Sequence, residues 1–412
     1  MIQETRIPQG YKDSPLGIIP EEWEVKRLGE LFSFKNGINA KKESYGGGIP
    51  FVNTMDVLNN TFLKANILRG KVDISPKTKE EFCVAYGDVL FNRTSETREE
   101  VGCSSVYIDA EDSVFGGFII RAHDIFPNLF DAVYKGYCFQ PFYIRNQISS
   151  LGNGAIRYNL GQEDLSRVKI LVPPILEQQR IVSVLHLWDT AIEKQSELIE
   201  KLKLRKIALM QQLLTGKKRL LGFCGEWKEV KLGEVFNERN ETNREDLPLL
   251  SITGDKGVIY QSDSDKRDIS NTDKSKYKRI CPNDIGYNTM RMWQGRSALS
   301  KLEGVVSPAY TIVTPKNHVN VKFMAMLIQQ PRVVYGFWTH SQGLVSDTLN
   351  CKYPDFCQVK VRIPIKEEQT EITSILVNAD KEIELANEKL TNLQSQKRGL
   401  MQQLLTGKKR IN

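Results

Sequence analysis

Two segments of the sequence combine side chains that can read the edges of DNA bases. They are Asn92-Arg-Thr-Ser-Glu-Thr-Arg98 and Asn288-Thr-Met-Arg-Met-Trp-Gln-Gly-Arg296. Each follows a short apolar run typical of a strand, at Asp88–Phe91 and Asp284–Tyr287. Arginine can bind guanine through two hydrogen bonds, Asn and Gln can bind adenine in the same way, and a planar Trp can stack on a base or wedge between two. We therefore expect both loops to contact DNA.

A second pair of loops, Gly152–Tyr158 and Ser341–Asp347, combines glycines with polar and aromatic side chains. Loops rich in Arg, Asn and Thr also occur on surfaces without a binding role, so each residue is a candidate only. The candidate DNA-binding residues are Asn92, Arg93, Thr94, Ser95, Arg98, Arg157, Tyr158, Arg291, Trp293, Gln294, Arg296 and Gln342.

The motifs of common catalytic sites are missing from the sequence. A P-loop needs Gly-x-x-x-x-Gly-Lys-Ser/Thr, and Gly216-Lys-Lys lacks the first Gly and the hydroxyl. Pro173-Pro174 follows Val172 and precedes Ile175, so it lacks the Asn or Asp and the aromatic residue of an adenine methyltransferase motif. There is no His-Glu-x-x-His zinc motif, and the four histidines are scattered. We predict that this chain has no catalytic residues and binds no metal or cofactor.

Length and composition place the chain among globular proteins of several domains. Its 412 residues predict two to four domains, and its net charge of +7 weakly favours an anionic partner. No run of 18 apolar residues suggests a membrane span, and the polar N-terminus lacks a signal core. The seven cysteines form no Cys-x-x-Cys pair, which is typical of reduced thiols. We expect a cytoplasmic protein without a membrane partner.

A repeat with an offset of 191 residues organises the chain. The segment MQQLLTGKKR occurs at 210–219 and again at 401–410. The two halves also begin alike, with Trp23…Leu28-Gly29 and Trp227…Leu232-Gly233. The offset aligns, without a gap, Pro173 with Pro364, Glu177 with Glu368, Gln178 with Gln369, Leu185 with Leu376, Asp189 with Asp380, Ile192 with Ile383 and Lys206 with Lys397. We infer a duplicated module, in which a variable region precedes a conserved segment.

Each conserved segment predicts one long helix with a heptad seam. The predicted helix at 175–215 would be about 60 Å long. The seam is interrupted by Gln195 or Ala386 and by Lys206 or Lys397. We expect the two seams to pair within the chain, although pairing with another protein and homodimerisation stay open. The predicted seam residues are Ile181, Leu185, Trp188, Ile192, Ile199, Leu202, Leu209 and Leu213, and Ile372, Leu376, Ile383, Leu390, Leu393, Leu400 and Leu404.

The variable regions mix strand and helix patterns, so the predicted fold class is α+β. Strands are expected at 49–57, 88–92, 118–126, 284–288 and 305–314, and helices at 128–148 and 320–335. The predicted domains are 1–172, a conserved helical region at 173–222, a second globular domain at 223–363 and a helical region at 364–412. If the two helices form an antiparallel intramolecular coiled coil, the chain is a dumb-bell with pseudo-two-fold symmetry.

The whole arrangement resembles the specificity subunit of type I restriction-modification systems. The resemblance covers nearly the whole chain. It rests on five features together, since any one motif alone would be weak evidence. They are the paired Trp…Leu-Gly starts, the Gly87-Asp-Val-Leu-Phe91 segment, the Met290-Arg-Met-Trp-Gln-Gly295 loop, the Pro-x-x-x-Glu-Gln runs at 173–178 and 364–369, and the twin helix ends.

The resemblance implies that each variable region is a target-recognition domain for one half of a split, asymmetric site in double-stranded DNA. The coiled coil would set the spacer and dock two methyltransferase subunits, which methylate adenine with S-adenosylmethionine. Restriction and translocase subunits, with ATP and Mg, would cut unmodified DNA. The half-sites would lie about one turn of DNA (~34 Å) or a little more apart. Such a chain is not an enzyme by itself, since catalysis lies in its partners.

Three other functions stay open at this stage. One is the DNA-reading subunit of a related restriction system, whose partner carries methylation and cutting together. A coiled-coil scaffold with two protein-binding heads would show no preference for DNA over other polyanions and no steep salt dependence. A stand-alone DNA-binding regulator would bind its site without any partner.

Overall fold

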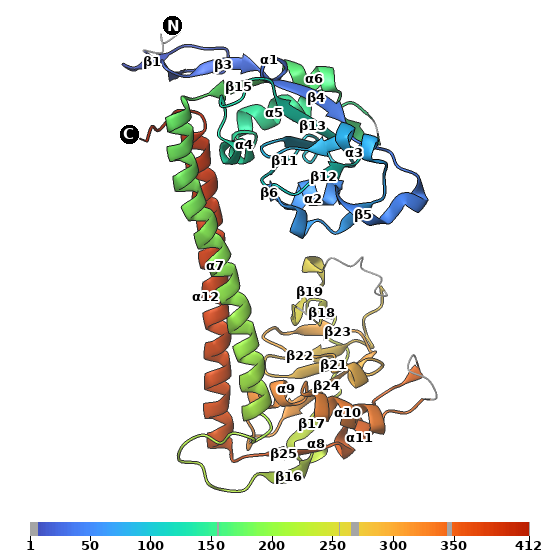
Figure 1. The fold of residues 1–412 in the computed structure, drawn as a ribbon. Coiled ribbons are helices and arrows are strands. Elements are labelled where there is room, and N and C mark those ends of the chain that lie inside the picture. Colours follow the sequence, from blue (N-terminus) through green and yellow to red (C-terminus); the bar gives the residue numbers. More distant parts are fainter. Residues whose placement is uncertain (1–6, 155, 255, 265–271, 344–347, 412) are drawn as a thin grey trace. The chain divides into compact units, whose positions relative to one another are not determined.

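A computed structural model describes residues 7–154, 156–254, 256–264, 272–343 and 348–411 (Figure 1). The chain divides into two compact units. Unit 1 comprises residues 1–195 and 389–412, and unit 2 comprises residues 196–388. Each unit therefore contains one globular domain and parts of both conserved segments. Among the described residues, no helix is both long and apolar enough to span a membrane.

The globular domain of unit 1 is built on two sheets. Its main strands are β4 (Phe32–Asn36), β5 (Tyr45–Val52), β6 (Phe62–Leu63), β7 (Gly70–Val72), β8 (Cys83–Val84), β9 (Val89–Asn92), β11 (Ser104–Tyr107), β12 (Ser113–Phe115) and β13 (Ile119–Asp124). The larger sheet has the order β4-β13-β9-β11-β6, and the smaller sheet has the order β7-β5-β12-β8.

Short helices cover the sheets of unit 1. They are α1 (Leu28–Leu31), α2 (Thr54–Asn59), α3 (Pro76–Phe82), α4 (Ala132–Cys138), α5 (Phe142–Leu151) and α6 (Gln162–Arg167), with 3-10 turns η1 (Lys42–Ser44) and η2 (Ala65–Ile67). Helix α2 packs against β9 and β11, and α4 packs against β11. Three further two-stranded ladders pair β1 (Tyr11–Lys12) with β2 (Ile19–Pro20), β3 (Glu24–Arg27) with β15 (Lys169–Val172), and β10 (Thr94–Ser95) with β14 (Tyr158–Asn159).

Unit 2 repeats this plan in reduced form. Its strands are β16 (Lys228–Lys231), β17 (Phe236–Arg239), β18 (Leu250–Ile252), β19 (Val258–Tyr260), β20 (Lys278–Ile280), β21 (Ile285–Asn288), β22 (Ser297–Leu299), β23 (Gly304–Val306), β24 (Tyr310–Pro315) and β25 (Lys360–Ile363). Its short helices are α8 (Leu232–Val235), α9 (Val321–Leu327), α10 (Pro331–His340) and α11 (Tyr353–Gln358), with 3-10 turns η3 (Gln261–Asp263) and η4 (Met292–Gln294). The main sheet has the order β17-β24-β21-β22, which matches β4-β13-β9-β11 of unit 1. The two domains therefore share one scaffold, as the repeat predicts.

The predicted strands and helices are correct in position, but two of the strands and both helices are predicted too long. The strand expected at 49–57 ends at Val52, because Asn53 caps α2 in a capping box with Asp56. The strand expected at 305–314 is two strands, β23 and β24, since Pro308 has no N–H to continue a ladder. The helices expected at 128–148 and 320–335 are each broken in two, before Phe142 and at Pro331.

The conserved segments form the two long helices α7 (Ile175–Leu213) and α12 (Lys366–Leu404), each of 39 residues. In unit 1, Lys397 of α12 bonds to Asp189 of α7, and in unit 2 Lys206 of α7 bonds to Asp380 of α12. As residue numbers rise along α7, those of its partners fall along α12. The helices are therefore antiparallel and pair within the chain, as predicted.

The seam residues lie where the heptad pattern predicts. None of the predicted seam side chains is exposed, and Ile181, Leu185, Ile372 and Leu376 are at most 1% exposed. The two predicted interruptions belong to the interface as well. Lys206 and Lys397 form the ion pairs just described, and Gln195 and Ala386 are buried. The helix ends also join the domain cores, since Leu185 and Leu404 lie in one apolar cluster with Trp23.

One glutamine at the start of each long helix anchors the globular domain. In unit 1, Gln178 accepts a hydrogen bond from the backbone N–H of Asp131 (2.9 Å) and donates to the backbone oxygens of Leu129 and Pro173 (3.0 and 2.8 Å). In unit 2, Gln369 accepts from the backbone N–H of Asn320 (2.8 Å) and donates to the oxygen of Pro364 (2.9 Å). Both amides are almost fully buried and form hydrogen bonds with backbone atoms of the domain.

Candidate nucleic-acid interface

Two of the predicted DNA-binding residues of unit 1 lie inside the domain. Asn92, at the end of β9, is fully buried and donates from Nδ2 to the backbone oxygen of Glu100 (3.1 Å). The Ser95 hydroxyl is also buried and donates to Oε2 of Glu100 (2.7 Å). Both side chains hold the 92–100 loop in shape. The surface available to DNA in this loop is therefore formed by its other residues.

Four remaining candidates of unit 1, Thr94, Arg98, Arg157 and Tyr158, are brought together by the pairing of β10 with β14, whereas half-buried Arg93 donates to the backbone oxygen of Gly117 (3.4 Å). Thr94 Oγ1 donates to Oδ1 of Asn159 (2.8 Å), which joins the 92–98 loop to the 152–158 loop. The guanidinium of Arg98 lies over the Tyr158 ring, 5.1 Å from its centroid. Arg157 lies 3.8 Å from a carboxylate oxygen of Glu96. The two loops predicted separately are thus one surface; Ala155, inside the second, lies outside the described residues.

Arg145 is a positioning residue that sequence reasoning missed. From α5, its guanidinium donates to the backbone oxygens of Glu99, Val101 and Gly102 (2.5–2.9 Å). It thereby fixes the far end of the 92–100 loop. Its position in a helix, 45 residues after the loop, gave no signal in the sequence.

In unit 2 the predicted loop forms the turn η4 after β21. Gly295 ends η4 in the left-handed region (φ 75°), where a glycine is favoured. A Cβ there would also come within 2.9 Å of Val334 on α10, so the loop lies tightly against that helix. The Trp293 indole donates to the backbone oxygen of Met290 (3.0 Å). These contacts hold Arg291, Gln294 and Arg296 at the surface.

A cavity of about 890 Å³ opens beside this loop. Three of the predicted residues, Arg291, Gln294 and Arg296, line it. It is also lined by Asn288, Tyr310 and Gln329, which sequence reasoning did not select. Its described lining contains no Asp or Glu side chain. The cavity therefore has the positive charge and the mixed donors and acceptors that suit nucleic acid.

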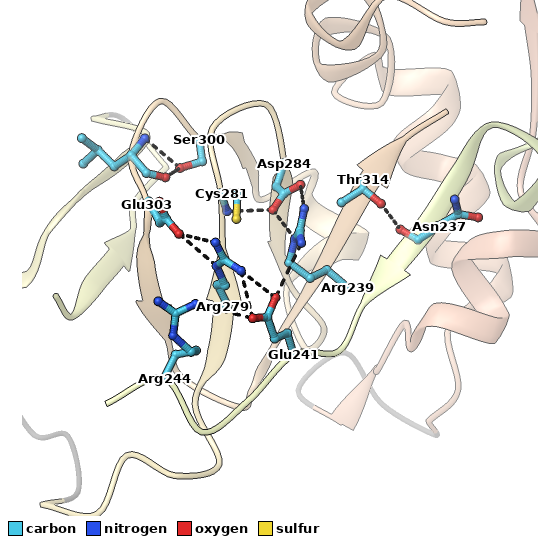
Figure 2. Close-up of polar contacts among 11 residues, drawn as sticks. Asn237, Arg239, Glu241, Arg244, Arg279, Cys281, Asp284, Ser300, Glu303 and Thr314 are labelled. Atoms are coloured by element: carbon cyan, nitrogen blue, oxygen red, sulfur yellow. Dashed lines mark hydrogen bonds and ion pairs between the residues drawn. The ribbon is translucent and has the colours of Figure 1, made fainter. Parts of the chain in front are cut away.

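Three other arginines in the globular domain of unit 2 are paired with carboxylates, and Figure 2 shows the pairs of Arg239 and Arg279. Arg239 donates to both oxygens of buried Asp284 (2.7 and 3.2 Å), and Arg279 contacts Glu241 and Glu303. Hydrogen bonds to Asp284 hold the pKa of Arg239 above its ordinary value. Arg244 is paired in the same way with Asp246 (2.8 Å). These ion pairs stabilise the packing of β17, β20 and β23. Their arginines are therefore already paired within the protein.

The last candidate, Gln342, lies apart from the cavity lining. Its Nε2 donates to Oδ1 of Asp355 (3.0 Å), and its backbone pairs with that of Asn350. The side chain is exposed. Residues 344–347 of this predicted loop lie outside the described residues.

The sequence matches a family model along most of its length. The model for the type I restriction modification DNA specificity domain matches residues 20–204 and again residues 225–395. The chain therefore belongs to this family and carries two such domains, which confirms the family that its repeated motifs predicted.

Relatives and solved structures agree with this assignment. A chain of Methanocaldococcus jannaschii, named as the candidate specificity subunit of type I restriction enzyme MjaX, is 24% identical over 98% of this chain and 97% of its own length. An HsdS subunit from Thermoanaerobacter tengcongensis has the same fold, with a TM-score of 0.52 and 17% identity over 94% of this chain and 98% of its own. A chain from a structure of type I R-M complex assembly and conformational transition gives a TM-score of 0.60 at 16% identity, over 94% and 99% of the two chains.

Proposed function

We propose that the two globular domains each read one half of a bipartite, asymmetric DNA site. One observation carries this proposal: two domains with the same strand order present different side chains at the same place. The loop after β9 holds two arginines and three glutamates between residues 92 and 100, whereas the loop after β21 holds two arginines and no acid between 288 and 296. Different surfaces on one scaffold select different half-sites.

The exposed and half-buried candidate residues of these surfaces are the proposed contacts with DNA. In unit 1 they are Arg93, Thr94, Arg98, Arg157 and Tyr158, and in unit 2 Arg291, Trp293, Gln294, Arg296 and Gln342. Asn92 and Ser95 support the first loop from inside the domain, since both are buried.

The two long helices set the spacer and dock two adenine methyltransferase subunits. Several leucines on their outer faces are exposed, and exposed apolar groups favour a protein partner. They include Leu176 (66%), Leu187 (70%) and Leu204 (66%) of α7 and Leu385 (54%) of α12. S-adenosylmethionine, ATP and Mg belong to the partner subunits, which carry methylation, translocation and cleavage. This chain has no catalytic role of its own.

Methylome sequencing tests this function directly. The chain is expressed with its modification subunit in cells that lack adenine methylation, and the subunit without the chain is the control. We expect methyladenine only when both are present, at a split motif with a fixed spacer. A folded complex that co-purifies but adds no methylation would overturn the proposal. A scaffold then remains if the complex has no preference for DNA, and a regulator remains if the chain alone binds a specific site.

A further inference from the structure

Three polar, uncharged side chains in the lining of the cavity in unit 2 come from separate elements. Asn288 and Tyr310 lie directly opposite each other on the antiparallel strands β21 and β24. Side chains opposite each other on one face of a sheet lie within contact distance. Gln329, just after α9, joins them in the lining. Three side chains that can hydrogen-bond to bases thus converge on one cavity.

Contacts within the protein hold these three side chains in place. The Tyr310 hydroxyl donates to the backbone oxygen of Ile252 (3.4 Å) and is hydrogen-bonded to the Asn288 side chain, and burial raises the pKa of Tyr310, so the phenol is neutral and fixed in place. Gln329 donates from Nε2 to the backbone oxygen of Ser297 (2.9 Å), which leaves its Oε1 as an acceptor. Asn288 Oδ1 accepts from the backbone N–H of Met290 (3.0 Å), and its amide N–H₂, which also bonds to the Tyr310 hydroxyl, is a donor. Fixed donors and acceptors suit the reading of a base edge.

The two arginines of the cavity lining differ from these three side chains in charge. Arg291 and Arg296 are exposed cations, whereas Asn288 and Tyr310 are half-buried and neutral, and Gln329 is exposed and neutral. Exposed cations with long, flexible side chains suit the phosphate backbone, which positions a protein without reading sequence. The neutral and the cationic side chains of the lining therefore suit two different parts of the same ligand.

We propose that Asn288, Tyr310 and Gln329 are specificity-determining residues that bond to the edge of a base pair in the half-site of unit 2. Arg291 and Arg296 bind the flanking phosphates. This inference rests on the proposed function, because it needs DNA to lie against the 288–296 loop.

The test compares duplexes that differ by one base pair. The full chain in complex with its modification subunits is titrated by fluorescence anisotropy. One duplex carries the split motif found by methylome sequencing, and the others are altered at each position of either half-site. The variants are Tyr310→Phe and Gln329→Ala. Matched controls are Tyr353→Phe, which also removes a hydroxyl bonded to a backbone oxygen, and Gln358→Ala, which also removes an amide bonded within unit 2. Neither control residue lines the cavity.

We expect each cavity variant to lower the discrimination at one position of one half-site by about fivefold to 100-fold. Discrimination at the other half-site and in both controls stays at the wild-type level. The inference is overturned if the variants weaken binding to all duplexes equally, or if they leave discrimination unchanged. A wild-type complex that prefers no duplex contradicts the proposed function itself, so the two failures are distinguishable.

Discussion

Arg410 grips the carboxylate of Glu177 through Nε and Nη2, at 2.9 Å in both contacts. Glu177 lies at the start of α7 and Arg410 lies just beyond the end of α12. Arg219 makes the same contact with Glu368 in unit 2, at 2.7 and 2.8 Å. Both carboxylates are at most 5% exposed, and hydrogen bonds to Glu177 hold the pKa of Arg410 above its ordinary value. Each unit is therefore closed by one buried ion pair between its two helices.

The two ion pairs are predicted to differ in their contribution to stability. In unit 1 the Trp23 indole also donates to Glu177 (2.8 Å), whereas the Trp227 indole N–H has no partner among the described residues. Removing Arg219 thus leaves buried Glu368 without a donor among the described residues, while Glu177 keeps the Trp23 indole. We expect Arg219→Ala to lower the free energy of unfolding by about 2–4 kcal/mol and Arg410→Ala by about 1–2 kcal/mol.

Urea unfolding monitored by circular dichroism measures both values. Lys409→Ala is the control, since it removes a neighbouring positive charge that is exposed. Equal losses for the two arginine variants would contradict the role given to Trp23.

The contribution of a leucine in α7 to stability is predicted to depend on its burial rather than on residue type. Leu185 is fully buried and Leu187, two residues further on, is 70% exposed. Leu185→Ala should lower the free energy of unfolding by about 2–5 kcal/mol, because it leaves a cavity in the core. Leu187→Ala should change it by less than about 0.5 kcal/mol. Denaturant titration of both variants checks this, and similar losses would argue against the assigned seam.

The salt dependence of DNA binding should report the two cavity arginines. Each phosphate contact contributes close to one to the slope of log K against log salt concentration. The Arg291→Ala, Arg296→Ala double variant should therefore lower the slope by about two, and weaken binding alike for all sequences. Arg244→Ala serves as control, because Arg244 is already paired with Asp246. A slope unchanged from wild type would show that Arg291 and Arg296 do not contact phosphate.

The length of the helices is predicted to set the spacer between the half-sites. Insertion of one heptad after Gln195 and one after Ala386 keeps both seams in phase, since these positions are related by the 191-residue repeat. Seven residues add about 10 Å of helix, and the spacer should grow by up to about three base pairs. The half-sites themselves should not change. Methylome sequencing determines both the half-sites and the spacer. An unchanged spacer would refute the prediction that the helices set its length.

The sequence predicted the helix pairing because the repeat constrains it. Lys206 aligns with Lys397 and Asp189 with Asp380, so an antiparallel pair brings each lysine to the aspartate of the other copy. Both contacts are present. The family also followed from the sequence, since its motifs recur at fixed spacing.

The extent to which each loop residue is buried could not be predicted in the same way. Asn92 and Asn288 end equivalent strands, yet Asn92 is fully buried and Asn288 is half-buried. Tyr310 and Gln329 reach the cavity only through the register of β21 with β24 and the position of α9, which no local pattern encodes. The pairing of Arg239 with Asp284 also depends on contacts between distant strands.

The anchoring glutamines, Gln178 and Gln369, have a consequence for how such proteins can diversify. Each holds its globular domain mainly through backbone atoms, at residues 129 and 131 in unit 1 and at residue 320 in unit 2. Backbone groups are the same whatever side chains the domain carries. A domain acquired by recombination can therefore keep these glutamine contacts whatever its side chains, whereas the contacts of Trp23 with Glu177 and of Tyr137 with Asp189 require the same residue types. New target sequences can then arise by exchange of whole modules, while the assembly with the other subunits is inherited intact.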